Sequence, residues 1–391
     1  MRVLSLFLLA TTLVAPAQML ETHTYATTGH PYQALETPDG QYVLVTIASV
    51  HGGGSGIDVF HIAGNKLDHV AFQPMGQEDA QGIVLIPHTR VLAVGLTNSG
   101  VAFLPLDDVL RGKAKSKPIS QGDRAGSGYL AATPDGQFLF VANEYGDGGN
   151  ISVVALHPDA DGVHPEMLAH IPAQQATFGV TLSPDGSRIY AVGEIVPPQL
   201  ATRLPGHGVA ELERIGCVQG RSRPTPNGIL YVIDVAKATA LTAASSQQQA
   251  AAARIAAVDS GCSPVRAATT PDGATVYVTA RGDNHVLAFD ARALETDPSR
   301  AFRLAIPSGG EEPVGLELFN GGKAMLVANA NNLTNGQGSI AVFDLSDPSK
   351  PVLRQTIKTR QFPRNISPSA DGTRLYLTEF LGDELMVLQP K

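Results

Sequence analysis

Thr133-Pro134-Asp135-Gly136, followed by the apolar run Phe138-Leu139-Phe140-Val141, is the stretch of sequence that decides the fold. Asp-Gly dipeptides favour the positive backbone dihedrals of tight hairpin turns, and short aromatic and β-branched runs favour half-buried strands. Weaker copies of the turn end at Gly322 and Gly372, and a degenerate copy occupies residues 87–90. The turn also recurs closely as Thr37-Pro38-Asp39-Gly40, Ser183-Pro184-Asp185-Gly186 and Thr270-Pro271-Asp272-Gly273. We therefore expect a repeated unit of strand, turn and strand.

A proline precedes four of these turns at a constant distance. Pro31 lies nine residues before Gly40, and Pro264, Pro313 and Pro363 lie nine residues before the glycines of their own turns. After each turn the sequence predicts a strand, a loop and a further strand, the last at 57–62, 101–106, 151–156, 229–235, 286–290, 340–345 and 385–389. Four antiparallel strands repeated about every 50 residues are typical of a β-propeller blade.

The spacing of the turns predicts seven blades. Gly186 and Gly273 are 87 residues apart, but the gap holds one set of strand signals. We interpret it as blade four with an insertion at about 197–226. The chain ends after the third strand of blade seven, and residues 21–27 supply the missing strand, which would remove an exposed sheet edge. The prediction is an all-β, seven-bladed β-propeller with four antiparallel strands per blade, closed by its N-terminal strand; two smaller domains are the alternative.

The N-terminus predicts export. Arg2 is followed by an apolar run over 3–14 and by Ala15-Pro16-Ala17, the small-x-small pattern of a signal peptide cleaved after residue 17. An uncleaved interfacial anchor is the alternative. We expect residues 18–391 to form an extracytoplasmic protein, periplasmic or secreted, with no membrane span. Cys217 and Cys262 suit an oxidising compartment, and we predict a disulfide that pins the insertion over the mouth of the propeller.

Composition narrows the partners. The chain has 28 basic and 36 acidic residues, a net charge of −8 and no long basic run, which excludes nucleic acid. Charged residues make up 16% of the chain, beside 40 Gly and 27 Pro, a balance that favours short strands over helices. We expect a monomer.

Several stretches carry a family resemblance. Phe140-Val141-Ala142-Asn143 and Leu326-Val327-Ala328-Asn329, set beside the Pro-Asp-Gly turns, resemble the YVTN-repeat β-propellers of the lactonase-like superfamily. The resemblance covers nearly the whole mature chain. It implies a propeller fold, and it is consistent with a lactone hydrolase or with an envelope protein of another kind. Because propellers support many chemistries, activity has to be argued from the site.

In a propeller, the loops between second and third strands and the links between blades gather at one mouth of the central channel, the expected site. The loops between second and third strands contribute His51, Asn143, Glu144, Glu194, Arg281, His285, Asn329 and Glu379. The blade links contribute His30 and Arg364. Just inside the channel, two residues after the proline position, we expect Gln33, Tyr129, Arg266 and Asn365.

These residues allow two functions. Lactone hydrolysis needs an activated water and an oxyanion stabiliser. Glu144, Glu194 or Glu379 could be the base, Arg281, Arg266 or Arg364 the oxyanion stabiliser, and His285 or His51 either. The other function is binding of a small molecule, glycan or envelope protein, with His30, Gln33, His51, Tyr129, Asn143, Arg266, Asn329 and Arg364 as ligand-binding residues. For any single residue, a solvated loop charge or a salt bridge at the rim is the alternative.

No cofactor is indicated. A divalent metal remains open, because His30, His51, His207 and His285 have carboxylates nearby in the sequence. None of these histidines has the spacing of a zinc or facial-triad motif, so the sequence assigns no metal ligand.

Overall fold

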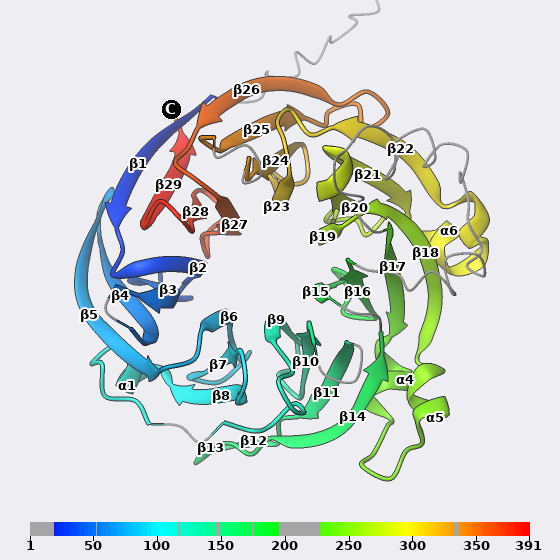
Figure 1. Ribbon diagram of the computed structural model, residues 1–391, viewed down its shortest axis with the longest axis horizontal. Coiled ribbons are helices and arrows are strands. Elements are labelled where there is room, and N and C mark those ends of the chain that lie inside the picture. The colour runs from blue at the N-terminus through cyan, green and yellow to red at the C-terminus, as the bar shows by residue number, and fades with distance from the viewer. Residues whose placement is uncertain are drawn as a thin grey trace, which may run out of the picture.

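The computed structural model describes residues 19–51, 53–115, 118–145, 149–173, 176–194, 227–331 and 336–391. These residues form seven main β-sheets arranged in a ring (Figure 1). The structure confirms the predicted all-β, seven-bladed β-propeller. The proposed signal peptide at 1–17 and the proposed insertion at 197–226 lie outside the described residues.

Blades one to three lie in the first part of the chain. Blade one comprises β2 (Gly29–Glu36), β3 (Tyr42–Val50), β4 (Ser55–Ala63) and β5 (Lys66–Gly76). Blade two comprises β6 (Ala80–Leu85), β7 (Val91–Leu96) and β8 (Gly100–Pro105). In this blade the fourth strand is reduced to a single bridge between Val101 and Ile119. Blade three comprises β9 (Ser127–Ala132), β10 (Phe138–Asn143), β11 (Asn150–Ala155) and β14 (Glu166–Pro172), with a hairpin of β12 (Pro158–Asp159) and β13 (Gly162–Val163).

Blades four to seven complete the ring. Blade four comprises β15 (Thr177–Leu182), β16 (Arg188–Gly193), β17 (Asn227–Asp234) and β18 (Arg254–Cys262). Blade five comprises β19 (Pro264–Thr269), β20 (Thr275–Ala280), β21 (His285–Asp290) and β22 (Phe302–Pro307). Blade six comprises β23 (Pro313–Phe319), β24 (Ala324–Asn329), β25 (Ser339–Asp344) and β26 (Val352–Lys358). Blade seven comprises β27 (Pro363–Pro368), β28 (Leu375–Glu379), β29 (Glu384–Pro390) and β1 (Leu20–Ala26).

The helices are short and lie between strands. They are α1 (Leu106–Val109), α4 (Val235–Thr239), α5 (Gln247–Ala251) and α6 (Ala291–Thr296), with 3-10 turns η1 (Arg281–Asp283) and η2 (Pro298–Arg300). Within the described ranges, no helix has the length and apolar character needed to cross a membrane.

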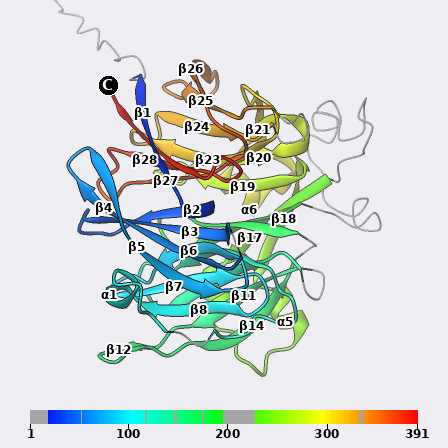
Figure 2. The same ribbon diagram turned by 60° about the vertical axis from the view of Figure 1, so that its left-hand side comes forward.

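The predicted closure of the ring by the N-terminal strand is confirmed. β1 pairs antiparallel with β29 over seven residue pairs, from Leu20 opposite Pro390 to Ala26 opposite Glu384. Both views show β1 beside the C-terminus (Figures 1 and 2). Leu20 is 3% exposed and packs into the core shared by blades six and seven. The last blade is therefore built from both ends of the chain.

The Pro-Asp-Gly turns join the first two strands of a blade, and each is stabilised by hydrogen bonds within the turn. In blade three the hydroxyl of Thr133 donates to Asp135 at 2.5 Å, and the same carboxylate accepts the backbone N–H of Gln137. Successive turns also touch, because a Cβ at Gly322 would lie 2.6 Å from Cδ of Pro271 in the preceding blade. Gly322 has φ +81°, so the position requires glycine for its conformation and for this contact.

The core consists of the interfaces between neighbouring blades. Between blades five and six, for example, the buried side chains of Tyr277, Val286, Met325, Val327 and Phe343 form one cluster. Alternate residues of each strand face the two neighbouring blades, which is why the strands read as nearly continuous apolar runs. The first strands of the blades line the centre of the ring. We call the end formed by the loops between second and third strands and the blade links the mouth, and the opposite end the turn side.

Candidate functional site

A pocket of about 260 Å³ lies at the mouth, where charged, aromatic and aliphatic side chains from five blades meet. Three of its residues, Glu144, Glu194 and Arg281, directly follow second strands, namely β10, β16 and β20. Arg266 on β19 and Arg364 on β27 project from first strands. The remaining lining is Phe178, Val265, Val314 and Phe362. The structure therefore brings five of the sequence-predicted site residues into one pocket.

The two channel arginines stack on tyrosine rings. The Arg266 guanidinium carbon lies 3.4 Å from the ring centroid of Tyr129, and that of Arg364 lies 4.0 Å from the centroid of Tyr32. Arg364 is also 5.0–5.4 Å from the rings of Phe380, Phe362 and Phe178. Aromatic faces attract a cation, but they offer no hydrogen-bond acceptor in the plane of the guanidinium.

Some nitrogens of both guanidinium groups lack a hydrogen-bond acceptor among the described residues. Nη1 of Arg266 donates to the carbonyl oxygen of Val265 at 3.2 Å. Nε and Nη2 of Arg266 and Nε of Arg364 are buried and have no hydrogen-bond partner among the described residues. Neither side chain forms an ion pair within the part of the chain that the structure describes. Burial lowers the pKa of Arg266, which reflects the cost of holding a charge away from water.

Two carboxyl groups stand opposite the arginines. Glu194 accepts from Nη2 of Arg281 at 2.8 Å. Burial raises the pKa of Glu194 to about 7; Arg281 opposes the shift, and nearby Glu144 adds to it. Burial also raises the pKa of Glu144, whose Oε1 accepts the hydroxyl of Tyr145 at 2.7 Å. A base with a pKa near neutrality beside cationic groups is an arrangement that hydrolases use.

Two predicted histidines meet elsewhere on the rim. His30 Nδ1 lies 2.6 Å from one oxygen of Asp383, and His51 Nε2 lies 2.8 Å from the other. Asp383, which the sequence did not single out, joins blade seven to blade one across the closure. Within the described ranges, no group of three His, Cys, Asp or Glu side chains has a geometry that would hold a metal ion.

Other predicted residues are buried in structural contacts. Asn143 is fully buried and bonds the side chains of Ser127, Asn150 and Ser152. Asn329 is fully buried and donates to the carbonyl oxygen of Ser308.

Glu379 and His285 also lie apart from the pocket. Glu379 is fully buried and accepts the backbone N–H of Arg360 at 3.1 Å. His285 bonds the carbonyl oxygen of Asp283 at 2.7 Å. Neither residue lines the mouth pocket.

Four further predicted residues remain. Gln33, Tyr129 and Asn365 line the channel below the mouth pocket. Cys262 is buried at the end of β18. Its proposed partner Cys217 lies outside the described residues, so the Cys217–Cys262 disulfide stays a prediction.

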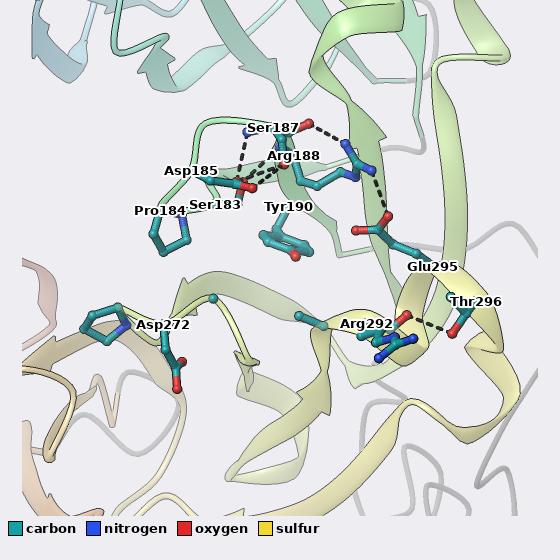
Figure 3. Close-up of a pocket in the computed structure, with 13 residues that line it drawn as sticks. Ser183, Pro184, Asp185, Ser187, Arg188, Tyr190, Asp272, Arg292, Glu295 and Thr296 are labelled. Carbon is teal, nitrogen blue, oxygen red and sulfur yellow. Dashed lines mark hydrogen bonds and ion pairs between the residues drawn. The ribbon is translucent and has the colours of Figure 1, made fainter.

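A larger pocket, of about 540 Å³, lies between blades four and five on the turn side (Figure 3). Arg188 donates to Glu295 at 2.8 Å and lies 3.4 Å from Asp234, so its charge is matched inside the protein. Asp185 accepts the hydroxyls of Ser183 and Ser187 (Figure 3). Because these charges are satisfied locally, we place the functional site at the mouth instead.

Sequence reasoning identified Tyr129 but missed four other aromatic side chains of the site, namely Tyr32, Phe178, Phe362 and Phe380. Tyr32 and Phe178 occupy the position one residue after the proline or its equivalent in blades one and four, and Arg364 holds that position in blade seven. The aromatic residues at this repeat position were the available signal. Phe362 and Phe380 lie in loops, whose residues have no fixed spacing from the repeated turns, so the repeat could not place them.

Comparison with known proteins supports the fold. No protein-family model matches the chain, and no curated protein matches it. The β-propeller domain of Cps50 (Swd1) from Myceliophteria thermophila is 10% identical, with a TM-score of 0.62 over 94% of this chain and 98% of that one. Hydrazine synthase from Kuenenia stuttgartiensis is 16% identical, with a TM-score of 0.61 over 93% of this chain and 96% of that one. At these identities the likeness shows the fold alone, and the chain is a seven-bladed β-propeller.

Proposed function

We propose that this protein binds a small organic anion at the mouth of the propeller, through Arg266 and Arg364. The observation that carries the proposal is the set of three buried guanidinium nitrogens without a hydrogen-bond partner among the described residues. Leaving the donors of a buried charged group without acceptors costs about 1–3 kcal/mol or more. The planar fork of a guanidinium matches a carboxylate or phosphate group, which would supply the missing acceptors.

The shape of the pocket favours a small molecule over a glycan chain or a protein. Its volume of about 260 Å³ lies just below the usual range of small-molecule sites, so it suits a ligand of few atoms. Phe178 and Phe362 form apolar walls that would cover the body of such a ligand. An acid with a short apolar or hydroxylated body fits this combination.

The test is a binding titration with small mono- and dicarboxylates and inorganic phosphate. Arg364→Met keeps the alkyl contacts and removes the charge, so we expect affinity for the best anion to fall about ten- to a hundredfold, the range for a lost charged hydrogen bond. Arg303→Met is the matched control, because Arg303 is 60% exposed and pairs with Asp290 away from the channel. Equal affinity in wild type and Arg364→Met would contradict the proposal.

A lactonase-type hydrolase is the second candidate, and one observation favours it. Glu194, with a pKa of about 7, lies in the same pocket as Arg266 and 2.8 Å from Arg281. Glu194 would take a proton from the attacking water, and Arg266 would stabilise the oxyanion on the ring carbonyl. Proton release from a lactone panel tests this: we expect Glu194→Gln to lower kcat with little change in KM. Anion binding without turnover of any lactone would contradict the hydrolase candidate and would leave anion binding as the only proposed function.

We also propose that the protein is exported and that it is related to the YVTN-type propellers. The apolar run and small-x-small pattern of residues 1–17 support a cleaved signal peptide, and the Pro-Asp-Gly repeats support a relationship to YVTN-type, lactonase-like propellers. Expression in a bacterial host followed by intact-mass analysis of the extracytoplasmic fraction tests export. The expected species begins at residue 18, whereas a full-length cytoplasmic product would contradict it.

A further inference from the structure

A second chamber lies deeper in the channel. It measures about 430 Å³ and is lined by all seven first strands. Arg266 lines both this chamber and the mouth pocket, so its side chain stands between them. Leu35, Val84 and Leu318, which lie near the turn ends of their strands, also line the chamber. The chamber therefore extends from the arginine toward the turn side.

Glu317 places a carboxyl group in this chamber. It lies on β23 between Leu316 and Leu318, and no described basic side chain forms an ion pair with it. Burial raises the pKa of Glu317 to about 8, and the backbone N–H of Leu318 opposes that shift. The mechanism proposed for the mouth does not use this residue. A lone carboxyl in a cavity gains most from a ligand that carries a positive charge.

Neutral polar groups accompany the carboxyl. Gln33 uses Oε1 to accept the N–H of Ile83 at 3.1 Å, and Asn365 uses Oδ1 to accept the hydroxyl of Ser367 at 2.7 Å. No hydrogen bond among the described residues uses the amide NH2 group of Gln33 or of Asn365. These donors suit a hydroxyl or ether oxygen on the same ligand.

The turn side carries fixed negative charge. In five of the turns the hydroxyl of the first residue helps to hold the pKa of the turn aspartate low, so these groups stay ionised at neutral pH: Asp39, Asp135, Asp185, Asp272 and Asp371. Carboxylates around an opening raise the local concentration of cations. Of the residues described as lining the chamber, Arg266 is the other charged one, and its guanidinium stacks on Tyr129 and reaches into the mouth pocket.

We propose that this chamber is a second binding site, for a small primary amine that enters from the turn side and pairs its ammonium group with Glu317. The amine arrives protonated, the Glu317 carboxyl loses its proton to solvent, and a charged N–H to O hydrogen bond forms. No covalent bond changes. This site does not rest on the anion site at the mouth, because the two use different charged groups.

Calorimetric titration with n-butylamine, ethanolamine and glucosamine at pH 7 tests the proposal. Two buffers of different ionisation enthalpy report the proton count. We expect at least one amine to bind with release of close to one proton, and n-butanol and glucose to bind at least tenfold more weakly. Glu317→Gln should lower amine affinity at least tenfold. Glu311→Gln, which alters an exposed blade-link carboxyl, should leave it unchanged.

A second measurement keeps the proposal testable if Glu317→Gln does not fold. In the wild-type protein, affinity for an amine that stays protonated should rise at least tenfold between pH 6 and pH 8, because Glu317, with a pKa of about 8, goes from almost fully protonated to about half ionised. A flat profile overturns the proposal. So does the absence of binding by all three amines, or equal affinity for glucosamine and glucose.

Discussion

Glu194 lies 2.8 Å from the guanidinium of Arg281, yet burial raises the pKa of Glu194 to about 7. The nearby carboxyl of Glu144 adds to the shift, and burial raises its pKa as well. A carboxyl that titrates near neutrality changes the charge of its pocket within the physiological range. The mouth is therefore more positive at pH 6 than at pH 8.

That charge change predicts how anion binding depends on pH. As the pH falls from 8 to 6, Glu194 gains a proton and stops repelling an anionic ligand. We expect affinity for a small carboxylate to rise about three- to tenfold, and Glu194→Gln to bind tightly at both pH values. Titrations of both proteins at pH 6 and pH 8 check this. Tighter binding by wild type at pH 8 would contradict it.

The glycines of one turn give a matched pair for testing the contact between blades. Gly321 and Gly322 both have positive φ, but a Cβ at Gly321 meets nothing within 4 Å, whereas one at Gly322 lies 2.6 Å from Pro271. Both Ala variants should lose about 1–2 kcal/mol to backbone strain. Gly322→Ala should lose roughly 1–3 kcal/mol more, the cost of overpacking. Denaturant unfolding of the two variants measures the difference, and equal losses would show that the turns do not press on one another.

At the scale of elements, the strand order of blade seven determines how the ring is closed. β1 is the outer strand of that sheet and pairs with β29 alone within its sheet, so the two chain ends hold the ring closed. Its backbone also bonds outside blade seven, because the N–H and carbonyl of Leu20 bond the side chain of Gln355 on β26. Loss of β1 exposes the edge of β29.

A truncation tests this closure. A protein starting at residue 27 should unfold at a lower temperature than one starting at residue 19, and it should form dimers or aggregates through the exposed β29 edge. Calorimetry and light scattering on the two proteins check both effects. Equal melting temperatures and monomeric behaviour would mean that the closure adds little to stability.

The sequence predicted elements better than it predicted the site, for reasons that individual residues show. The spacing from Pro264 to its turn glycine put Arg266 on the channel wall, because a first strand is regular. Asn143 and Glu144 are adjacent at the end of β10, yet one is buried in a polar network and the other lines the pocket. Glu317 lies four residues after its proline, deeper than the position we considered. Which side chain at a strand end lines the pocket, and how deep in the channel a residue lies, depends on packing against neighbouring blades. The sequence of a single repeat does not contain that information.

At the scale of the whole molecule, charge is divided along the channel. Arg266 and Arg364 face the mouth, Glu317 occupies the chamber below, and ionised turn aspartates surround the opposite opening. The two ends of one channel therefore favour ligands of opposite charge.

Three carboxyls with raised pKa values also set the pH dependence of folding. Burial raises the pKa of Glu317 to about 8 and of Glu194 and Glu379 to about 7, against an ordinary value of 4.5. Between pH 5 and pH 8 the folded protein therefore holds more protons than the unfolded chain, so stability falls as the pH rises. The slope is at most about 1.4 kcal/mol per pH unit for each group. Denaturant unfolding at four pH values checks this, and Glu317→Gln should flatten the curve; stability that rises toward pH 8 would contradict it.

The central claim is that three guanidinium nitrogens of Arg266 and Arg364 have no acceptor among the described residues, and anomalous diffraction from a crystal soaked in bromide tests it most directly. We predict a strong anomalous peak at the mouth, within hydrogen-bond distance of Nε or Nη2 of Arg266 and of Nε of Arg364. No peak at that position, with both guanidinium groups bonded to a carboxylate of the protein itself, would contradict the claim that the mouth is built for an anion.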